Sequence, residues 1–259
     1  MPRPRRAVVP LALSLLLLLG ACAAFAAPAP ARPILPLPAL SLGIGTADGP
    51  QDVALSLQIV ALITVLSIAP AILLMLTSFT RILVVLGFIR TALGLQQTPP
   101  NQVITSLALF LTFFTMSPVW NQIYNQALNP YLQGAIPAEA AWNETIDPLR
   151  TFMFKQTREK ELSLMIRLSG EEQPQNRDGV STMLLIPAYV LSELKTAFQM
   201  GVVLYIPFIV VDMIVASILM SMGMMMLPPS MISLPFKILL FVMADGWNLI
   251  VASLVTSFN

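Results

Sequence analysis

Four long apolar runs limit what this chain can fold into. They cover residues 55–76, 103–119, 202–226 and 232–256. A helix that crosses a bilayer needs roughly 20 apolar residues, so three runs are long enough and the second is marginal. Hydrophobic residues make up 56% of the 259 residues and charged residues only 10%, whereas a soluble domain has about 25% charged residues. The sequence therefore predicts an all-α integral membrane protein.

Composition excludes several classes of function. The net charge is +1, which gives no attraction for nucleic acid, and histidine, the commonest general base and metal ligand, is absent. Cys22 is the single cysteine and lies near the N-terminus, so a processed chain would have no thiol. The sequence also lacks the zinc-protease, nucleophile-elbow and glycine-rich phosphate-binding motifs. We therefore expect no enzymatic activity and no cofactor.

Residues 1–27 are typical of a cleavable signal peptide. Arg3, Arg5 and Arg6 provide the positive charge, residues 8–19 form a short apolar segment, and residues 24–26 read Ala-Phe-Ala, a small-residue cleavage site. An uncleaved anchor and lipoprotein processing at Cys22 are the alternatives. Residues 28–54 are rich in proline and alanine and are expected to be extended or disordered.

The rest of the chain divides into two apolar halves around a more polar insertion. Residues 55–120 predict a first helical hairpin and residues 186–259 a second. Arg81 and Arg90 are the only charges between the first two apolar runs. Because short loops rich in arginine stay cytoplasmic, residues 121–185 are predicted to be a periplasmic insertion. Within this insertion, residues 155–161 predict a solvated helix.

Several charged residues fall in or beside the apolar runs. Glu193 and Lys195 precede the third run, Asp212 lies within it, and Lys237 and Asp245 lie within the fourth. A charge at bilayer depth costs about 2.5–3.5 kcal/mol on insertion scales, so such residues face a partner or water. The simplest pairing joins Asp212 to Lys237 on adjacent antiparallel helices. We expect salt bridges between helices or between subunits.

Two functional alternatives use the same charges. A secondary transporter would place Asp212, Lys237 and Asp245 near the midplane of the membrane, with helix breaks at Pro70 and Pro207. An intramembrane acid–base dyad of Asp212 and Asp245 would require the two carboxyl groups to share a proton, and Lys237 competes for both.

A methionine-rich block separates the third and fourth runs. Residues 220–226 read Met-Ser-Met-Gly-Met-Met-Met, and Leu-Pro-Pro follows. Methionine is unbranched, soft and able to repack. The block either fills gaps between helices or forms a deformable apolar constriction.

Four stretches of this chain resemble the FliP family, the P subunit of the flagellar type III export gate. The resemblance covers residues 55–259, and its motifs are long and specific. They are TSFTRILVVL at 77–86, LGLQQTPPNQ at 93–102, PAYVLSELKTAF at 187–198, and residues 222–247 with MMMLPP and LPFKILLF.

The resemblance implies a role in protein export. Members of this family assemble as a homo-oligomer, a pentamer in the known assemblies, with the gate subunits FliQ and FliR. The export components FlhA and FlhB, membrane lipid and unfolded flagellar rod, hook and filament subunits are the further partners implied. The family's helices form bent hairpins in a helical ring at the inner membrane, largely on its periplasmic side, rather than simple spans.

The resemblance also assigns roles to residues. Met224, Met225 and Met226 match the family's methionine gasket, which would seal the pore. Gly223 would give the adjoining backbone its freedom, and Pro228 and Pro229 would break the helix and present the loop inward. The charged residues Glu193, Lys195, Asp212 and Lys237 become subunit contacts, and Phe152 and Phe154 become candidate anchors between copies.

Overall fold

The computed structural model describes residues 50–95, 97–170, 174, 176–224 and 226–258. Most of these residues are helical and no strand occurs among them, which confirms the all-α prediction. The predicted signal peptide, residues 1–27, and residues 28–49 of the proline- and alanine-rich segment lie outside the described residues.

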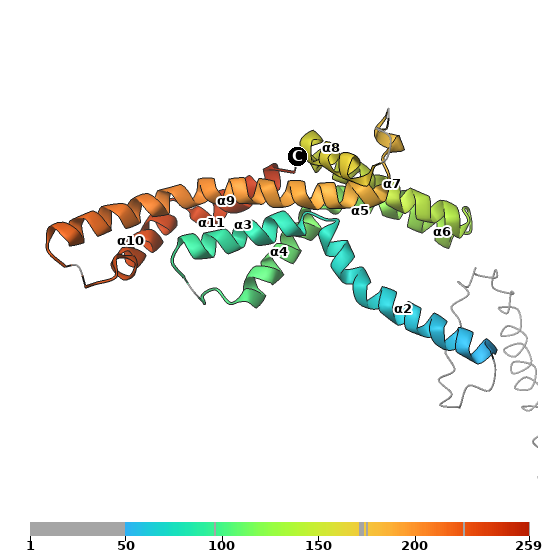
Figure 1. Cartoon of the computed structure of the whole chain (residues 1–259), viewed down its shortest axis with the longest axis horizontal. Coiled ribbons are helices and arrows are strands. Elements are labelled where there is room, and N and C mark those ends of the chain that lie inside the picture. The colour runs from blue at the N-terminus through green and yellow to red at the C-terminus, as the bar shows by residue number, and fades with distance from the viewer. Residues whose placement is uncertain (1–49, 96, 171–173, 175, 225, 259) are drawn as a thin grey trace, which may run out of the picture.

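Helix α9, Thr182–Ser221, is the longest of the described helices (Figure 1). It contains 40 residues, a length of about 60 Å for a straight α-helix. Ser181 caps its N-terminus by accepting a hydrogen bond from the backbone N–H of Met183. The helix continues through Pro187 and Pro207, so the helix break at Pro207 that the transporter alternative invoked is absent from α9. The third apolar run is therefore only the second half of a longer helix.

The first hairpin consists of α3, Phe79–Ala92, and α4, Asn101–Thr115. The turn between them includes Gly94, whose φ is 75°, and a cis peptide bond between Thr98 and Pro99. At the other end of the hairpin, the hydroxyls of Ser78 and Thr115 are hydrogen-bonded at 2.6 Å. The preceding helix α2, Pro50–Met75, runs unbroken through Pro70 and projects away from the other helices (Figure 1).

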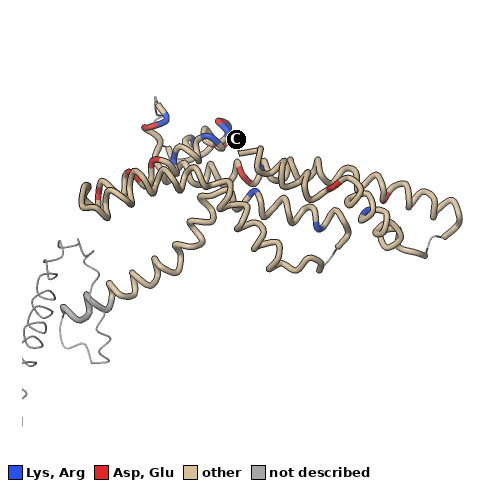
Figure 2. Tube along the Cα trace, turned by 180° about the vertical axis from the view of Figure 1, so that it is seen from behind, with Lys and Arg blue, Asp and Glu red and all other residues tan. Residues whose placement is uncertain are grey.

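The insertion between the hairpins is helical and packs against the first half of α9. After α4 the chain bends by 57° at Met116, so the second apolar run is divided between two helices. Residues 155–161 do not form the predicted solvated helix, because α7 ends at Gln156 and α8 begins at Glu159. Most of the charged residues outside the apolar helices lie in this region (Figure 2). Its elements are α5 (Ser117–Ile123), η1 (Tyr124–Leu128), α6 (Asn129–Leu132), α7 (Ala138–Gln156), α8 (Glu159–Ser169) and η2 (Arg177–Gly179).

The second hairpin returns along α9 as two helices rather than one. Helix α10, Pro229–Met243, and helix α11, Gly246–Thr256, meet at a 63° bend. Asp245 occupies the break with a left-handed φ of 49°. At Gly246 an added Cβ would lie 2.3 Å from the Phe241 ring, so the bend needs a residue without a side chain there. The fourth apolar run, 232–256, is therefore divided between two helices.

The described part of the chain has two helices long and apolar enough to cross a membrane, part of α2 and all of α9. There are up to four such segments if each bent pair, α4 with α5–α6 and α10 with α11, counts as one span. Bent pairs of this kind agree with the hairpins that the family resemblance implied.

A buried ion pair joins the two hairpins. The Arg81 guanidinium donates to both carboxylate oxygens of Glu193, at 2.9 and 2.5 Å, and the two side chains are 3% and 0% exposed. Arg81 also donates to the Gln156 amide oxygen and to the backbone and hydroxyl oxygens of Ser257. Its guanidinium lies 4.1 Å from the centre of the Phe258 ring. All five N–H donors of the arginine are thus used.

This burial corrects the sequence interpretation of Arg81. The residue lies within α3 and its charge is neutralised by Glu193 inside the protein, so it is not a free loop charge. Its placement on the cytoplasmic side, with Arg90, stays a prediction. Phe152 is also a core residue, stacked on Phe258 and in contact with Tyr189, rather than an anchor exposed for a neighbouring copy.

We predict that Glu193→Gln lowers stability strongly, because it leaves the buried arginine cation uncompensated. Breaking one side of a buried ion pair costs about 3–5 kcal/mol. The double variant Arg81→Met, Glu193→Leu removes both charges and should be more stable than Glu193→Gln. Thermal unfolding in detergent, followed by tryptophan fluorescence, tests this order. Arg167→Gln, at an exposed position on α8, is the control. A Glu193→Gln protein as stable as the control would contradict the prediction.

Candidate functional site

The methionine-rich block forms the turn between α9 and α10. Helix α9 ends at Ser221, and Gly223 follows with a left-handed φ of 73°. The backbone N–H of Gly223 donates to the carbonyl of Met220, and that of Met224 donates to the carbonyl of Leu219. This is the glycine-terminated helix end that a left-handed residue permits.

The two prolines set the start of the returning helix. Pro228 is the N-cap of α10 and Pro229 is its first residue. Proline is well suited to this position because the first N–H groups of a helix have no partner within it. The sequence therefore identified the residues that end one helix and begin the next. The turn they define lies at one extreme of the long axis of the molecule (Figure 1).

The methionines of this turn are exposed in the isolated chain. Met226 is 98% exposed and Met224 is 41% exposed, and Met220 and Met222 are also exposed. Met225, the third predicted gasket residue, lies outside the described residues. A cluster of large apolar side chains at the tip of a hairpin, without cover from its own chain, indicates a surface that contacts something else.

Behind the tip, a charged network fastens α10 to α9. Lys237 donates from Nζ to Asp212 Oδ2 at 2.5 Å, which is the pairing that the sequence predicted. Ser233 donates to the other carboxylate oxygen of Asp212, also at 2.5 Å. The Lys237 side chain is 4% exposed and that of Asp212 is 34% exposed. Ser233 precedes Lys237 by four residues and so lies on the same face of α10.

Asp245 has a separate environment from Asp212. It lies at the break between α10 and α11, where its carboxylate accepts a hydrogen bond from the Asn248 amide at 3.1 Å. The two carboxylates thus have different hydrogen-bond partners, and Lys237 is bonded to only one of them. Among the described residues, no three His, Cys, Asp or Glu side chains converge to hold a metal ion.

The remaining predicted charges have partners on other helices of the same chain. Glu193 pairs with Arg81, and Lys195 donates to Glu161 Oε1 at 2.7 Å. The hydrogen bond from Lys195 lowers the pKa of Glu161, so this buried carboxylate stays ionised at neutral pH. Arg90 lies in the last turn of α3 and donates to the side-chain oxygen of Asn101.

Sequence reasoning missed four groups that complete these networks, namely Gln156, Glu161, Ser233 and Ser257. Glu161 was assigned to a solvated helix, but it is a buried residue of α8 whose partner, Lys195, lies on α9. Neither Gln156 nor Ser257 carried a signal in the sequence that it would bind Arg81. Only Ser233 could have been found, from its one-turn spacing to Lys237.

We predict an asymmetric response in the Asp212–Lys237 pair. Asp212→Ala leaves the buried ammonium group of Lys237 without its carboxylate partner. It should lower the free energy of unfolding by about 3–5 kcal/mol. Lys237→Met should cost less, because Asp212 is one-third exposed and keeps its bond from Ser233. Thermal unfolding of both variants in detergent is the measurement, with Asp178→Asn, an exposed position, as the control. Equal losses in the two variants would refute the asymmetry.

Comparison with known proteins places this architecture in a family. The sequence model of the FliP family matches residues 62–254. The chain is 49% identical to the flagellar biosynthetic protein FliP of Bacillus subtilis (strain 168), over 84% of this chain and 98% of that protein. It is 52% identical to the protein of that name from Borreliella burgdorferi, over 81% and 84% of the two chains. It is also 51% identical to the FliP of Pectobacterium carotovorum, over 82% of each. The chain therefore belongs to the FliP family.

Proposed function

We propose that this chain is a structural, channel-forming subunit of the flagellar type III protein export gate in the bacterial inner membrane. Membership of the FliP family and the name of its relatives, flagellar biosynthetic protein, support the flagellar role. The observation that carries the channel role is the exposed methionine tip, with Met226 98% exposed at the end of a hairpin. Unfolded rod, hook and filament subunits would pass through the channel.

The chemistry of the tip suits a seal that must open without recognising one sequence. In the proposed gate, copies of Met224, Met225 and Met226 from several subunits meet at the axis. Thioether side chains are flexible and polarizable, so they can close on each other and then yield around a passing chain. A closed apolar constriction excludes ions by excluding water. No nucleotide-binding motif occurs in the sequence, so partner proteins or the membrane potential would supply the energy.

Assembly into a ring would cover apolar surface that the isolated chain exposes. Phe110, Phe113 and Phe114 on α4 are all exposed, and their spacing places them on one face of the helix. Aromatic residues are enriched in the buried cores of protein interfaces. We infer a homo-oligomer, a pentamer as the family resemblance implies, completed by FliQ and FliR and working with FlhA and FlhB. It would lie partly on the periplasmic side of the inner membrane.

The transporter alternative has less support than the gate. It requires Asp212, Lys237 and Asp245 to serve a substrate or a proton path at the midplane. In this chain Asp212 accepts hydrogen bonds from both Lys237 and Ser233, while Asp245 lies at a helix break. An interhelix clamp accounts for these contacts without a transported solute.

We predict that replacing Met224, Met225 and Met226 together with alanine causes ion leak or growth arrest while export is largely retained. Shorter side chains leave the closed constriction open to water, but the path for the exported chain remains. Conductance of the cell membrane and secretion of flagellar subunits are the two readouts. Met183→Ala is the matched control, since this methionine is 79% exposed at the opposite end of α9. Unchanged leak in the triple variant would contradict the seal.

We predict that the protein, co-expressed with its candidate companions, purifies in mild detergent as a large closed ring. Electron cryomicroscopy should place Met224–Met226 at the narrowest point. Phe110→Glu combined with Phe114→Glu should reduce the assembly, because two charges would then lie in an apolar contact. A small particle lacking a ring, with Asp212 and Asp245 lining a midplane cavity, would favour the transporter instead.

A further inference from the structure

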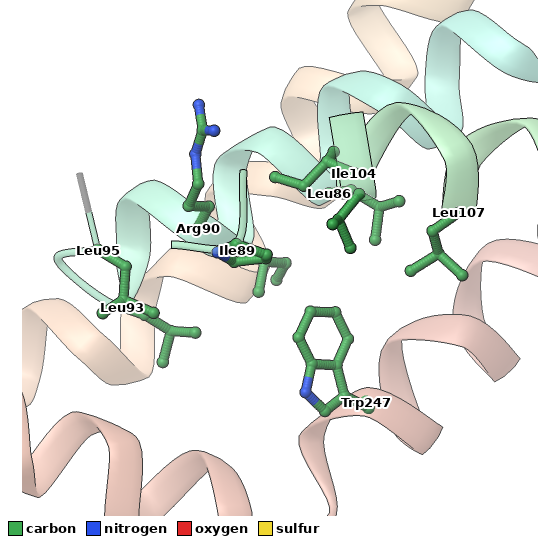
Figure 3. Close-up of a pocket in the computed structure, with 10 residues that line it drawn as sticks. Leu86, Ile89, Arg90, Leu93, Leu95, Ile104, Leu107 and Trp247 are labelled. Carbon is green, nitrogen blue, oxygen red and sulfur yellow. The ribbon is translucent and has the colours of Figure 1, made fainter. Parts of the chain in front are cut away.

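An apolar cavity lies between the tip of the first hairpin and α11. Its volume is about 220 Å³, and Leu86, Ile89 and Leu107 line it together with Trp247 (Figure 3). Apart from Arg90 and the indole N–H of Trp247, the side chains that line it are entirely apolar. The indole of Trp247 faces Ile89 and Leu86 across this space (Figure 3). No site described above uses this cavity.

Arg90 also lines a second, more polar groove next to the cavity. This groove has a volume of about 360 Å³ and lies between the end of α3 and the start of α10, where Thr91 and Ser230 contribute polar groups. The Arg90 guanidinium points away from Trp247 (Figure 3). One arginine therefore lies at the boundary between an apolar cavity and a polar groove.

Within the described part of the apolar helices, Arg90 is the cation that forms no salt bridge. Among the described residues of α2–α4 and α9–α11, the positively charged side chains are Arg81, Arg90, Lys195 and Lys237. Each of the other three forms a salt bridge, with Glu193, Glu161 and Asp212 respectively. The neutral side chain of Asn101 is the partner that Arg90 has within the described chain. A cation in a membrane protein is expected to have an anionic or aqueous partner.

We propose that this region binds one anionic phospholipid, with an acyl chain in the apolar cavity and the headgroup phosphate on Arg90. The match is one of charge and polarity. The apolar cavity suits a hydrocarbon chain, and the polar groove suits the polar part of a headgroup. Arg90 lies at the boundary between them, which is where the phosphate of a phospholipid connects its acyl chains to its headgroup. Basic pockets between transmembrane helices bind anionic headgroups in this way. The proposal does not depend on the export role.

The test uses Trp247 as a reporter for the acyl chain. The sequence has three tryptophans, so a Trp120→Phe, Trp142→Phe background leaves Trp247 alone. The full-length protein is reconstituted in phosphatidylcholine vesicles with a small fraction of brominated phosphatidylglycerol or brominated phosphatidylcholine. The site, as reported by quenching of Trp247 fluorescence, should bind brominated phosphatidylglycerol about fivefold more tightly than brominated phosphatidylcholine. This is the size of preference expected for one basic side chain.

Two variants separate the parts of the site. Arg90→Gln should abolish the preference for the anionic lipid, while Arg90→Lys and the exposed control Arg167→Gln should keep it. Leu107→Phe, which fills the cavity, should reduce quenching by both brominated lipids. Unfolding temperatures of the variants confirm that each is folded.

Equal quenching by the two lipids in the unsubstituted protein would overturn the proposal. So would a preference that survives Arg90→Gln, or quenching that is unaffected by Leu107→Phe. If Leu107→Phe instead changes the oligomeric state and no lipid preference exists, the cavity is a contact with another protein and the lipid assignment is wrong.

Discussion

The Arg81–Glu193 ion pair fixes the arrangement on which the rest of the structure depends. It joins α3 of the first hairpin to α9 of the second, and the same guanidinium holds Gln156 at the end of α7 and Ser257 after α11. A buried charge is tolerated only when its partner and its hydrogen bonds are complete. This requirement leaves little freedom for α9 to slide along α3, so the pair sets the register of both hairpins at once.

That register explains why both hairpin tips point toward the same end of the molecule (Figure 1). The Tyr189 hydroxyl donates to the carbonyl of Thr77 at 2.8 Å, and the centres of the Phe88 and Phe198 rings lie 5.2 Å apart. Because the residue numbers increase together in these two contacts, α3 and α9 run in the same direction. The chain beyond α9 then returns through α10 and α11 to the level of the ion pair. The second half of α9 therefore holds the methionine turn at a fixed distance from the Arg81–Glu193 ion pair.

The sequence was enough to predict the elements whose causes are local. Apolar runs predicted that these segments are helical, but not where the second and fourth runs bend. Gly223 with Pro228 and Pro229 predicted the turn, because backbone preference decides this feature. The pairing of Asp212 with Lys237 followed from adjacent antiparallel helices. The burial of Arg81 and Glu161 could not be predicted, since their partners are separated from them by 112 and 34 residues. The break at Asp245 also depends on tertiary contacts, through the approach of Gly246 to the Phe241 ring.

A gate of the proposed kind needs both a rigid support and a soft contact, and this chain places them next to each other. The Asp212–Lys237–Ser233 network and the contact between the Phe208 and Phe241 rings fasten α9 to α10 just behind the turn. Beyond the network, the turn presents the exposed side chains of Met222, Met224 and Met226. A rigid tip could not adapt to different passing chains, while a soft support would let neighbouring tips drift apart and leak. Confining flexibility to thioether side chains satisfies both demands.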